Sequence, residues 1–377
     1  MRVLFTNAPP VGHFLPLVPF AQAMREAGHE VAFASYPGLA EPVARLGFRH
    51  VPAGLASDPA DLALVTDRPV FAELWPRNML PDLLALAATW PPDLLVRGTL
   101  EYGGCIAAEA LGLPHAAIAV NADVDFFAPA RLAAPLGALR AEHGLPPDPA
   151  LAMLDRYLTL RPFPPRFRDP GRPVGPTTHH LRPPLGDRTG AERLPPWVAD
   201  LGDRPVVYVG LGTLFNQPAL FRAILAGLRD EAVTLVVTVG RDQEPGDYGA
   251  QPENVHVERY IPVSLLLPHC ALAVTNGGSG TLTAALAHGL PVVVVPTGAD
   301  QPANAARCAA LGLGRVVPAA ALTPEAVRAA VRAVLADPTY RRNTERLRDE
   351  MAALPGPEHA VALLERLARD KQPILSV

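Results

Sequence analysis

A glycine-rich break at residues 276–281 separates an apolar run from a helical run in the second half of the chain. It reads Asn-Gly-Gly-Ser-Gly-Thr, follows the apolar residues 271–275 and precedes a helical pattern at 282–288. A break of this kind between a strand and a helix leaves backbone N–H groups free at the positive end of the helix dipole, which suits a phosphate or diphosphate. We expect the hydroxyls of Ser279 and Thr281 to add donors there.

A second polar group follows the next apolar run, residues 291–295. Asp300 and Gln301 place a carboxylate and an amide together just beyond that run. Ligands of open α/β sheets bind at the carboxyl ends of the strands. A diphosphate on one loop and a hydroxyl-rich group on the next describe a nucleotide-sugar.

These two loops resemble the donor-sugar signature of the GT-B glycosyltransferases, in the GT1-like branch that decorates macrolides, polyketides and other natural products in actinobacteria. The matching residues are Gly277, Gly278, Gly280, Thr281, Asp300, Gln301 and Asn304. Asn276 departs from the signature, because the family usually has a phosphate-binding histidine there. An asparagine can donate a neutral hydrogen bond but carries no positive charge. The resemblance covers essentially the whole chain.

A histidine ends the first loop of the chain, residues 7–13. His13 is expected just before a helix, where the dipole disfavours imidazolium and leaves a neutral ring able to accept a proton. From the residues alone, a capping or hydrogen-bonding histidine with no chemistry is the favoured interpretation. The resemblance implies that His13 is the general base that deprotonates the acceptor hydroxyl.

A catalytic histidine needs an acid that fixes its tautomer and stabilises the imidazolium. The family often supplies an aspartate at the position that is Gly98 here. Glu101 is one substitute, and Asp123 or Asp125 is another. A solvated carboxylate at a helix start remains the alternative interpretation of Glu101.

The resemblance assigns the remaining site residues. Those facing the donor diphosphate are Gly212, Thr213, Asn276, Gly277, Gly278, Ser279, Gly280 and Thr281. Those around the nucleobase are Ile261, Pro262 and Val263, and those of the acceptor pocket are Gly12, Trp75, Phe126 and Phe127. No tryptophan lies in residues 259–263 to stack on a base, which favours a TDP- or UDP-sugar as co-substrate. The acidic pair at 123 and 125 is common by chance, so we expect no metal and no further cofactor.

The elements that must position these residues alternate as strand and helix in both halves of the chain, which predicts two parallel-sheet α/β domains. Residues 162–197 are too rich in proline to continue a helix or sheet. We predict an acceptor domain at 1–175, a linker at 176–200, a donor domain at 201–355 and a C-terminal helix at 356–377. The resemblance implies a GT-B fold, with two Rossmann-like domains facing across a cleft and the last helix crossing back to the first domain.

Composition limits the partners. A chain of 377 residues with a net charge of −4 has no basic run for nucleic acid or an anionic membrane. Three widely spaced cysteines and the absence of a long apolar stretch favour a cytoplasmic protein. We expect an inverting, metal-independent transferase that moves a sugar to a hydroxyl of a small hydrophobic aglycone, and a homodimer or an auxiliary protein stays open. The alternatives are a non-catalytic helper of a partner enzyme and a nucleotide-sugar epimerase of the same fold.

Overall fold

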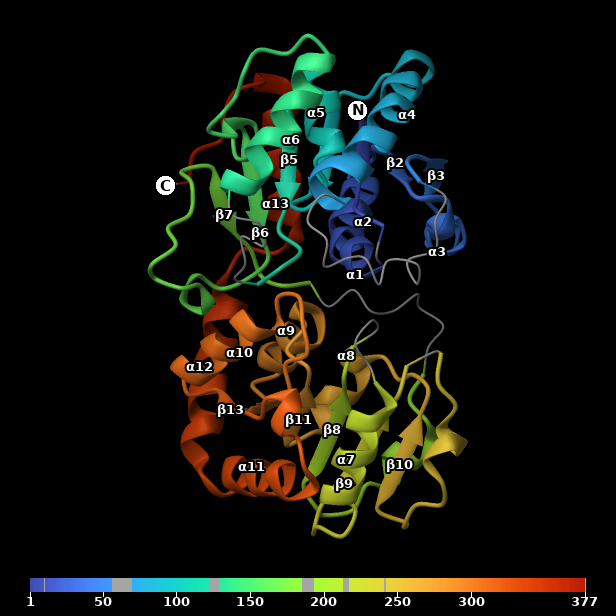
Figure 1. The fold of residues 1–377 in the computed structure, drawn as a ribbon, viewed down its shortest axis with the longest axis vertical. Helices are drawn as coiled ribbons and strands as arrows, with labels where there is room; N and C mark the ends of the chain where they lie inside the picture. Colours follow the sequence, from blue (N-terminus) through green and yellow to red (C-terminus); the bar gives the residue numbers. More distant parts are fainter. Residues whose placement is uncertain are drawn as a thin grey trace.

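Two parallel β-sheets, each covered by helices, form the two halves of the chain (Figure 1). The computed structural model describes residues 1–9, 11–55, 70–122, 129–184, 193–212, 217–240 and 242–376. The inner strands of both sheets are buried along nearly their whole length, as expected for parallel strands with helices on both faces, whereas the edge strands are only partly buried. The predicted fold class is therefore confirmed.

The first sheet has seven strands in the order β3-β2-β1-β4-β5-β6-β7. They are β1 (Arg2–Thr6), β2 (Glu30–Ser35), β3 (Arg49–Pro52), β4 (Leu94–Gly98), β5 (His115–Ile118), β6 (Leu158–Arg161) and β7 (Thr178–His180). The helices between them are α1 (Val11–Phe14), α2 (Val18–Glu26), α3 (Ala40–Arg45), α4 (Trp75–Thr89), α5 (Gly103–Ala110) and α6 (Pro129–Glu142). A 3-10 turn at Leu15–Leu17 joins α1 to α2, and a π-helical turn at Val70–Leu74 leads into α4.

The second sheet has six strands in the order β10-β9-β8-β11-β12-β13. They are β8 (Val206–Gly210), β9 (Thr234–Thr238), β10 (Val255–Glu258), β11 (Leu272–Thr275), β12 (Val292–Val294) and β13 (Gly314–Val316). Its helices are α7 (Pro218–Leu228), α8 (Val263–Leu266), α9 (Ser279–Ala287), α10 (Gln301–Ala310), α11 (Pro324–Ala336) and α12 (Pro338–Ala353).

The strand order reverses at the centre of each sheet, and the candidate site residues follow these central strands. In the first sheet β1 lies between β2 and β4, so the loops after β1 and β4 open on the same crevice. In the second sheet β8 lies between β9 and β11, with the same consequence for the loops after β8 and β11. Such switch points are where open α/β sheets bind ligands.

The last helix, α13 (Pro357–Asp370), packs against the first domain, as the resemblance implied (Figure 1). Leu363, Leu364 and Leu367 belong to the same buried cluster as the side chains of β1 and α2. His29 and Glu365 add a polar contact of 2.9 Å between Nε2 and Oε1. The first domain therefore completes its core with residues from the far end of the chain.

The structure corrects one prediction about connecting chain. Residues 178–180 of the predicted linker form β7 and pair with β6, because this short proline-free stretch can donate backbone hydrogen bonds.

Candidate functional site

The glycine-rich loop between β11 and α9 has a backbone that only glycine accommodates easily. Gly277 has φ +84°, and a Cβ there would come within 2.7 Å of Val294 Cγ1. The Gly277 and Gly278 N–H groups bond to Thr275 Oγ1 at 3.2 Å and Asn276 Oδ1 at 3.0 Å. In the described part of the chain no acceptor is recorded for the N–H groups of Ser279, Gly280 and Thr281, which open α9 and are free for an anion.

Asn276 is a structural member of this loop. Its Nδ2 donates to Leu211 O at 2.6 Å, and its Oδ1 accepts from Gly278 N. A Cβ on Gly212, whose φ is +74°, would lie 3.0 Å from Asn276 Nδ2, so the loops after β8 and β11 approach closely because Gly212 has no side chain. The amide that replaces the family's histidine thus ties two loops together. Thr213 lies outside the described residues.

The Ser279 hydroxyl does not face a diphosphate, which corrects the expectation that it would be a phosphate donor. Ser279 Oγ donates its only hydrogen to Asp300 Oδ2 at 2.5 Å. Asn304 Nδ2 donates to the same Asp300 oxygen at 3.0 Å. The sequence could not reveal this contact, because it depends on how the start of α9 faces the loop after β12.

Asp300 and Gln301 are brought together at the start of α10, with exposed fractions of 6% and 3%. Gln301 Oε1 accepts from Thr297 N at 2.8 Å, Thr297 Oγ1 at 2.7 Å and Gly298 N at 3.1 Å. Ala299 has φ +53°, a left-handed conformation that costs a non-glycine residue energy and is concentrated at ligand loops. Fixing Oε1 in this way leaves the Gln301 Nε2 group as the donor that a ligand can use.

The predicted nucleobase residues lie at the start of α8, near the carboxyl end of β10. Ile261 and Pro262 are buried and Val263 is half-buried. Trp197 was not among the predicted site residues, and its ring stacks on His256 of β10 with 3.8 Å between centroids. Trp197 Nε1 also donates to Glu258 at 3.2 Å, so the interdomain segment is fastened beside this region.

His13 lies inside a helical run, in α1, and not ahead of a helix as expected. Burial lowers its pKa from 6.5 to about 4, and the Asp300 carboxylate acts in the opposite direction. The ring is therefore neutral as predicted, but burial is the cause. Its Nδ1 is buried and has no hydrogen-bond partner among the described residues, and its ring lies 6.1 Å from that of Phe71. A neutral imidazole of the first domain thus lies within the field of a carboxylate of the second.

Glu101 does not orient His13 and is not a solvated carboxylate. It is 4% exposed, and its oxygens accept from Thr6 Oγ1 at 2.5 Å and from Gly104 N at 2.8 and 3.0 Å. Burial raises the pKa of Glu101, and these hydrogen bonds oppose the rise. A Cβ on Gly104 would lie 2.5 Å from the Glu101 carboxylate. The carboxylate therefore fits against the start of α5 only because glycine has no side chain. Glu101 caps a helix, and Asp123 lies outside the described residues.

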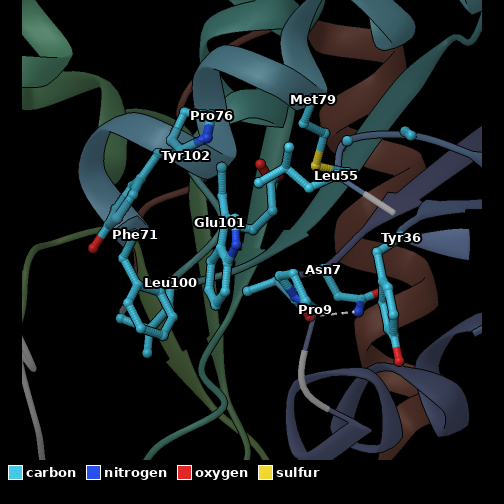
Figure 2. Close-up of a pocket in the computed structure, with 14 residues that line it drawn as sticks. Asn7, Pro9, Tyr36, Leu55, Phe71, Pro76, Met79, Leu100, Glu101 and Tyr102 are labelled. Carbon is cyan, nitrogen blue, oxygen red and sulfur yellow. Dashed lines mark hydrogen bonds between the residues drawn. The ribbon is translucent and has the colours of Figure 1, made fainter. Parts of the chain in front are cut away.

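A narrow aromatic pocket opens beside these groups (Figure 2). Trp75 lines it and meets Phe71 edge-to-face with 4.2 Å between ring centroids. Asn7 also lines it, and its Oδ1 is buried with no hydrogen-bond partner in the described chain. Gly12 is exposed on α1 and is not one of the residues lining this pocket. Phe126 and Phe127 lie outside the described residues.

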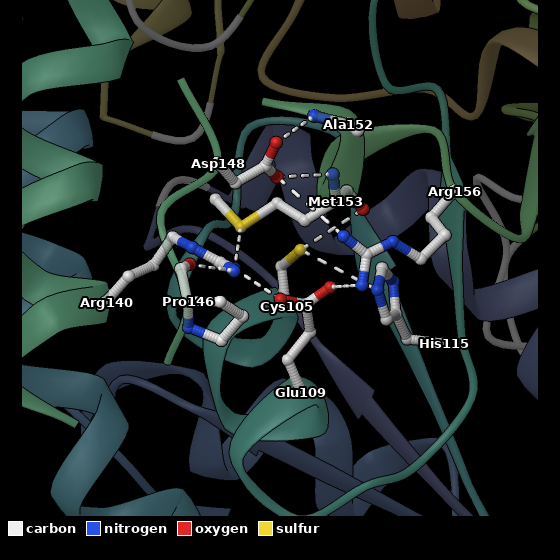
Figure 3. Close-up of polar contacts among 9 residues, drawn as sticks. All are labelled: Cys105, Glu109, His115, Arg140, Pro146, Asp148, Ala152, Met153 and Arg156. Carbon is white, nitrogen blue, oxygen red and sulfur yellow. Dashed lines mark hydrogen bonds and ion pairs between the residues drawn. The ribbon is translucent and has the colours of Figure 1, made fainter. Parts of the chain in front are cut away.

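A second group of reactive side chain types lies away from the crevice and is structural (Figure 3). Cys105 Sγ and His115 Nε2 are 3.8 Å apart. Burial raises the pKa of Cys105 to about 12 and lowers that of His115 to about 3, so both are neutral and the thiol is no nucleophile. Glu109 between Arg140 and Arg156 joins α5 to α6 and the segment before β6.

No three His, Cys, Asp or Glu side chains in the described ranges come together as a metal ion would require. None of the helices in those ranges combines the length and apolar character needed to cross a bilayer.

Comparison with known proteins agrees with this geometry. Residues 222–367 match the family described as Erythromycin biosynthesis protein CIII-like, C-terminal domain. Tylactone mycaminosyltransferase of Streptomyces fradiae is 32% identical, over 97% of this chain and 92% of the relative. 3-alpha-mycarosylerythronolide B desosaminyl transferase of Saccharopolyspora erythraea is 28% identical, over 99% of each chain.

The solved structures include a close match to the whole chain. The crystal structure of glycosyltransferase VinC in complex with dTDP superposes with a TM-score of 0.81 at 29% identity, covering 98% of this chain and 100% of that one. The sequence relatives and this structural neighbour therefore agree along nearly the full length. The chain belongs to the GT-B glycosyltransferases of actinobacterial antibiotic biosynthesis.

Proposed function

We propose that this enzyme transfers a sugar from a TDP-sugar to a hydroxyl of a small hydrophobic aglycone, with inversion at the anomeric carbon. The proposal is carried by an electrostatic interaction between two groups from different domains. His13 of the first domain is neutral, and the charge of Asp300 in the second domain acts on it. A base and a sugar-binding carboxylate near one another across the crevice are what a single displacement at the sugar requires.

In this mechanism His13 removes the proton from the acceptor hydroxyl. The hydroxyl oxygen attacks the anomeric carbon from the face opposite the diphosphate, and the bond from that carbon to the diphosphate oxygen breaks. The diphosphate leaves with the electron pair of that bond. Because the reaction is one displacement, the configuration at the anomeric carbon inverts.

The departing diphosphate is stabilised by the start of α9. The N–H groups of Ser279, Gly280 and Thr281 lie in the first turn of α9, at the positive end of the helix, and together with the Thr281 hydroxyl they are proposed to bind the diphosphate. These donors take the part that a divalent ion has in other transferases, so the proposed reaction is independent of added metal. Thymidine as the base is supported by the dTDP bound in the VinC structure.

The acceptor is proposed to bind beside His13, in the pocket lined by Phe71 and Trp75. Its aromatic walls suit an apolar ring system. The unpartnered Asn7 Oδ1 supplies one acceptor for a hydroxyl of that molecule. Asp300 and the Gln301 amide are proposed to hold hydroxyls of the donor sugar.

The first experiment is a calorimetric titration with TDP, UDP and GDP, with and without EDTA. Micromolar binding of TDP that is insensitive to EDTA is the expected result. A transfer assay follows, with TDP-sugars and a panel of macrolide and aromatic polyketide aglycones, and NMR of the product gives the anomeric configuration. Retained configuration, or loss of transfer in EDTA, would refute the mechanism. TDP binding without transfer to any aglycone would favour a non-catalytic helper.

A further inference from the structure

Three side chains at the junction of the domains form one buried hydrogen-bonded group. Ser279 begins α9, while Asp300 immediately precedes α10 and Asn304 lies in that helix. They are 7%, 6% and 0% exposed. Ser279 Oγ donates to Asp300 Oδ2 at 2.5 Å, and Asn304 Nδ2 donates to the same oxygen at 3.0 Å. One oxygen of the carboxylate is therefore held by two donors.

The only hydrogen of the Ser279 hydroxyl is committed to Asp300 Oδ2. The Ser279 oxygen accepts from Ala122 N at 2.8 Å and lies 3.2 Å from Asn304 Nδ2. Asn304 Nδ2 has two hydrogens and also donates to Gly277 O at 2.9 Å and to Asp300 Oδ2, so Ser279 shares one of those hydrogens. Ser279 therefore has no hydrogen left for a phosphate.

The Ala122 bond crosses from the first domain to the second. Ala122 follows β5, and its own carbonyl accepts from the guanidinium of Arg161 at 3.0 Å. Ala119 and Ala122 also pack in the apolar cluster that contains Leu282 of α9. The peptide that reaches Ser279 is thus anchored within the acceptor domain, and it immediately precedes the segment that leads to α6.

We propose that Ser279 is a positioning residue that acts through Asp300 and joins the donor-sugar site to the acceptor domain. It fixes Oδ2 of Asp300 so that Oδ1 is turned to the sugar, and its second contact, with Ala122 N–H, makes this arrangement depend on the domains being together. The inference rests on the proposed function, in which Asp300 holds the sugar of a nucleotide-sugar. It predicts that replacing Ser279 lowers the affinity for the sugar part of the nucleotide-sugar and leaves the affinity for the nucleotide unchanged.

The test compares affinity for TDP with affinity for TDP-glucose and TDP-rhamnose. In Ser279→Ala, TDP binding is expected within about threefold of wild type, and binding of the preferred TDP-hexose is expected to fall about 10- to 100-fold, the range for a lost hydrogen bond to a charged group. Ser279→Thr keeps the hydroxyl and restores most of that binding. Thr281→Ala is the matched control, since Thr281 is proposed to face the diphosphate and its loss weakens TDP and TDP-hexose alike.

A second measurement reads the contact between domains directly. Hydrogen exchange at the Ala122 amide is expected to be roughly tenfold faster in Ser279→Ala, because its acceptor is gone. The Ala119 amide bonds to Leu160 O at 2.9 Å within the first sheet, and its exchange stays unchanged if the variant is folded.

Equal losses for TDP and TDP-hexose in Ser279→Ala, or no loss for either, would overturn the inference. So would unchanged exchange at Ala122 in a variant whose Ala119 amide stays protected. If the wild-type protein binds neither TDP nor any TDP-hexose, the proposed function fails, and this result is distinct from a failure of Ser279 alone.

Discussion

The two loops that face each other across the domains differ in how they use their polar groups. On the donor side the side chains of Asn276, Ser279 and Gln301 are each bonded to a neighbour. On the acceptor side His13 Nδ1 and Asn7 Oδ1 are buried and have no partner within the described chain. The donor loops are held in place by hydrogen bonds, with Asn304 Oδ1 behind them as a buried oxygen that lacks a partner in the described chain, whereas the acceptor loop itself leaves polar atoms for a ligand.

The difference follows from what each loop must bind. A nucleoside diphosphate is the same in every turnover, so a loop that is already rigid loses little entropy when it binds. A base must exchange a proton with the acceptor, so its nitrogen cannot be committed to a structural bond. The unpartnered atoms of the first domain are therefore where we expect substrate to change the protein's hydrogen bonding.

The largest expected effect comes from removing the uncommitted nitrogen. His13→Ala should lower the transfer rate about 10²- to 10⁴-fold, the usual contribution of a general base. TDP affinity should be unchanged, because no donor-loop hydrogen bond recorded in the described chain involves His13. His359→Ala, on an exposed position of α13, is the control for loss of a histidine. An active His13→Ala enzyme would show that the acceptor side carries no base.

A glycine substitution on each side tests the rigidity of the two loops. Gly277→Ala places a Cβ 2.7 Å from Val294 Cγ1 at φ +84°, and TDP affinity should fall about 10-fold or more, measured by calorimetry. Gly12→Ala meets nothing within 4 Å and should leave TDP affinity and thermal stability as in wild type. Equal losses in both variants would mean that the donor loop is no more constrained than the acceptor loop.

Glu101 tests whether a buried carboxylate on the acceptor side serves structure or chemistry. Glu101→Gln should change turnover by less than about threefold but cost about 1 kcal/mol of stability, since the amide Nε2 would face a donor. Thermal unfolding at several pH values checks this. Because the folded pKa is raised, wild-type stability relative to the variant should decline as pH rises from 4.5 through the folded pKa. A hundredfold loss of turnover at unchanged stability would make Glu101 the orienting acid.

The smallest expected effect is a change in rate with pH. With a pKa of about 4, His13 stays about nine-tenths deprotonated at pH 5, so kcat/KM should lose only about a tenth of its value there. TDP affinity measured over the same range controls for changes in donor binding. An acid limb centred near pH 6.5 would instead describe an ordinary exposed histidine and contradict the lowered pKa of His13.

The parts of the fold with strong local signals were predictable from the sequence. Buried parallel strands such as β1 and β11 are uninterrupted apolar runs, and the glycines at 277, 278 and 280 mark the break before α9. The last helix crossing back to the first domain came from the family resemblance, and the structure confirms it.

The errors have a common physical origin, which is that side chain contacts depend on elements distant in sequence. Ser279 was assigned to phosphate because its position in the loop is right, but its partner Asp300 lies 21 residues away. Glu101 was a candidate for the acid that orients His13 because it lies near Gly98 in the sequence. Its hydrogen-bond partner in the structure is instead Thr6, which is 95 residues away. Arg97, which holds the carbonyls of Thr99 and Glu101 at 3.2 and 3.1 Å, carried no signal at all.

The contribution of α13 to the first domain has a consequence for synthesis on the ribosome. Strands β1 to β7 emerge early, but the leucines of α13 that cover their core are made about 190 residues later. At roughly 5–20 residues per second this is a delay of about 10–40 s. During that interval the nascent first domain exposes the apolar surface that Leu363, Leu364 and Leu367 later bury, so we expect chaperones to bind it there.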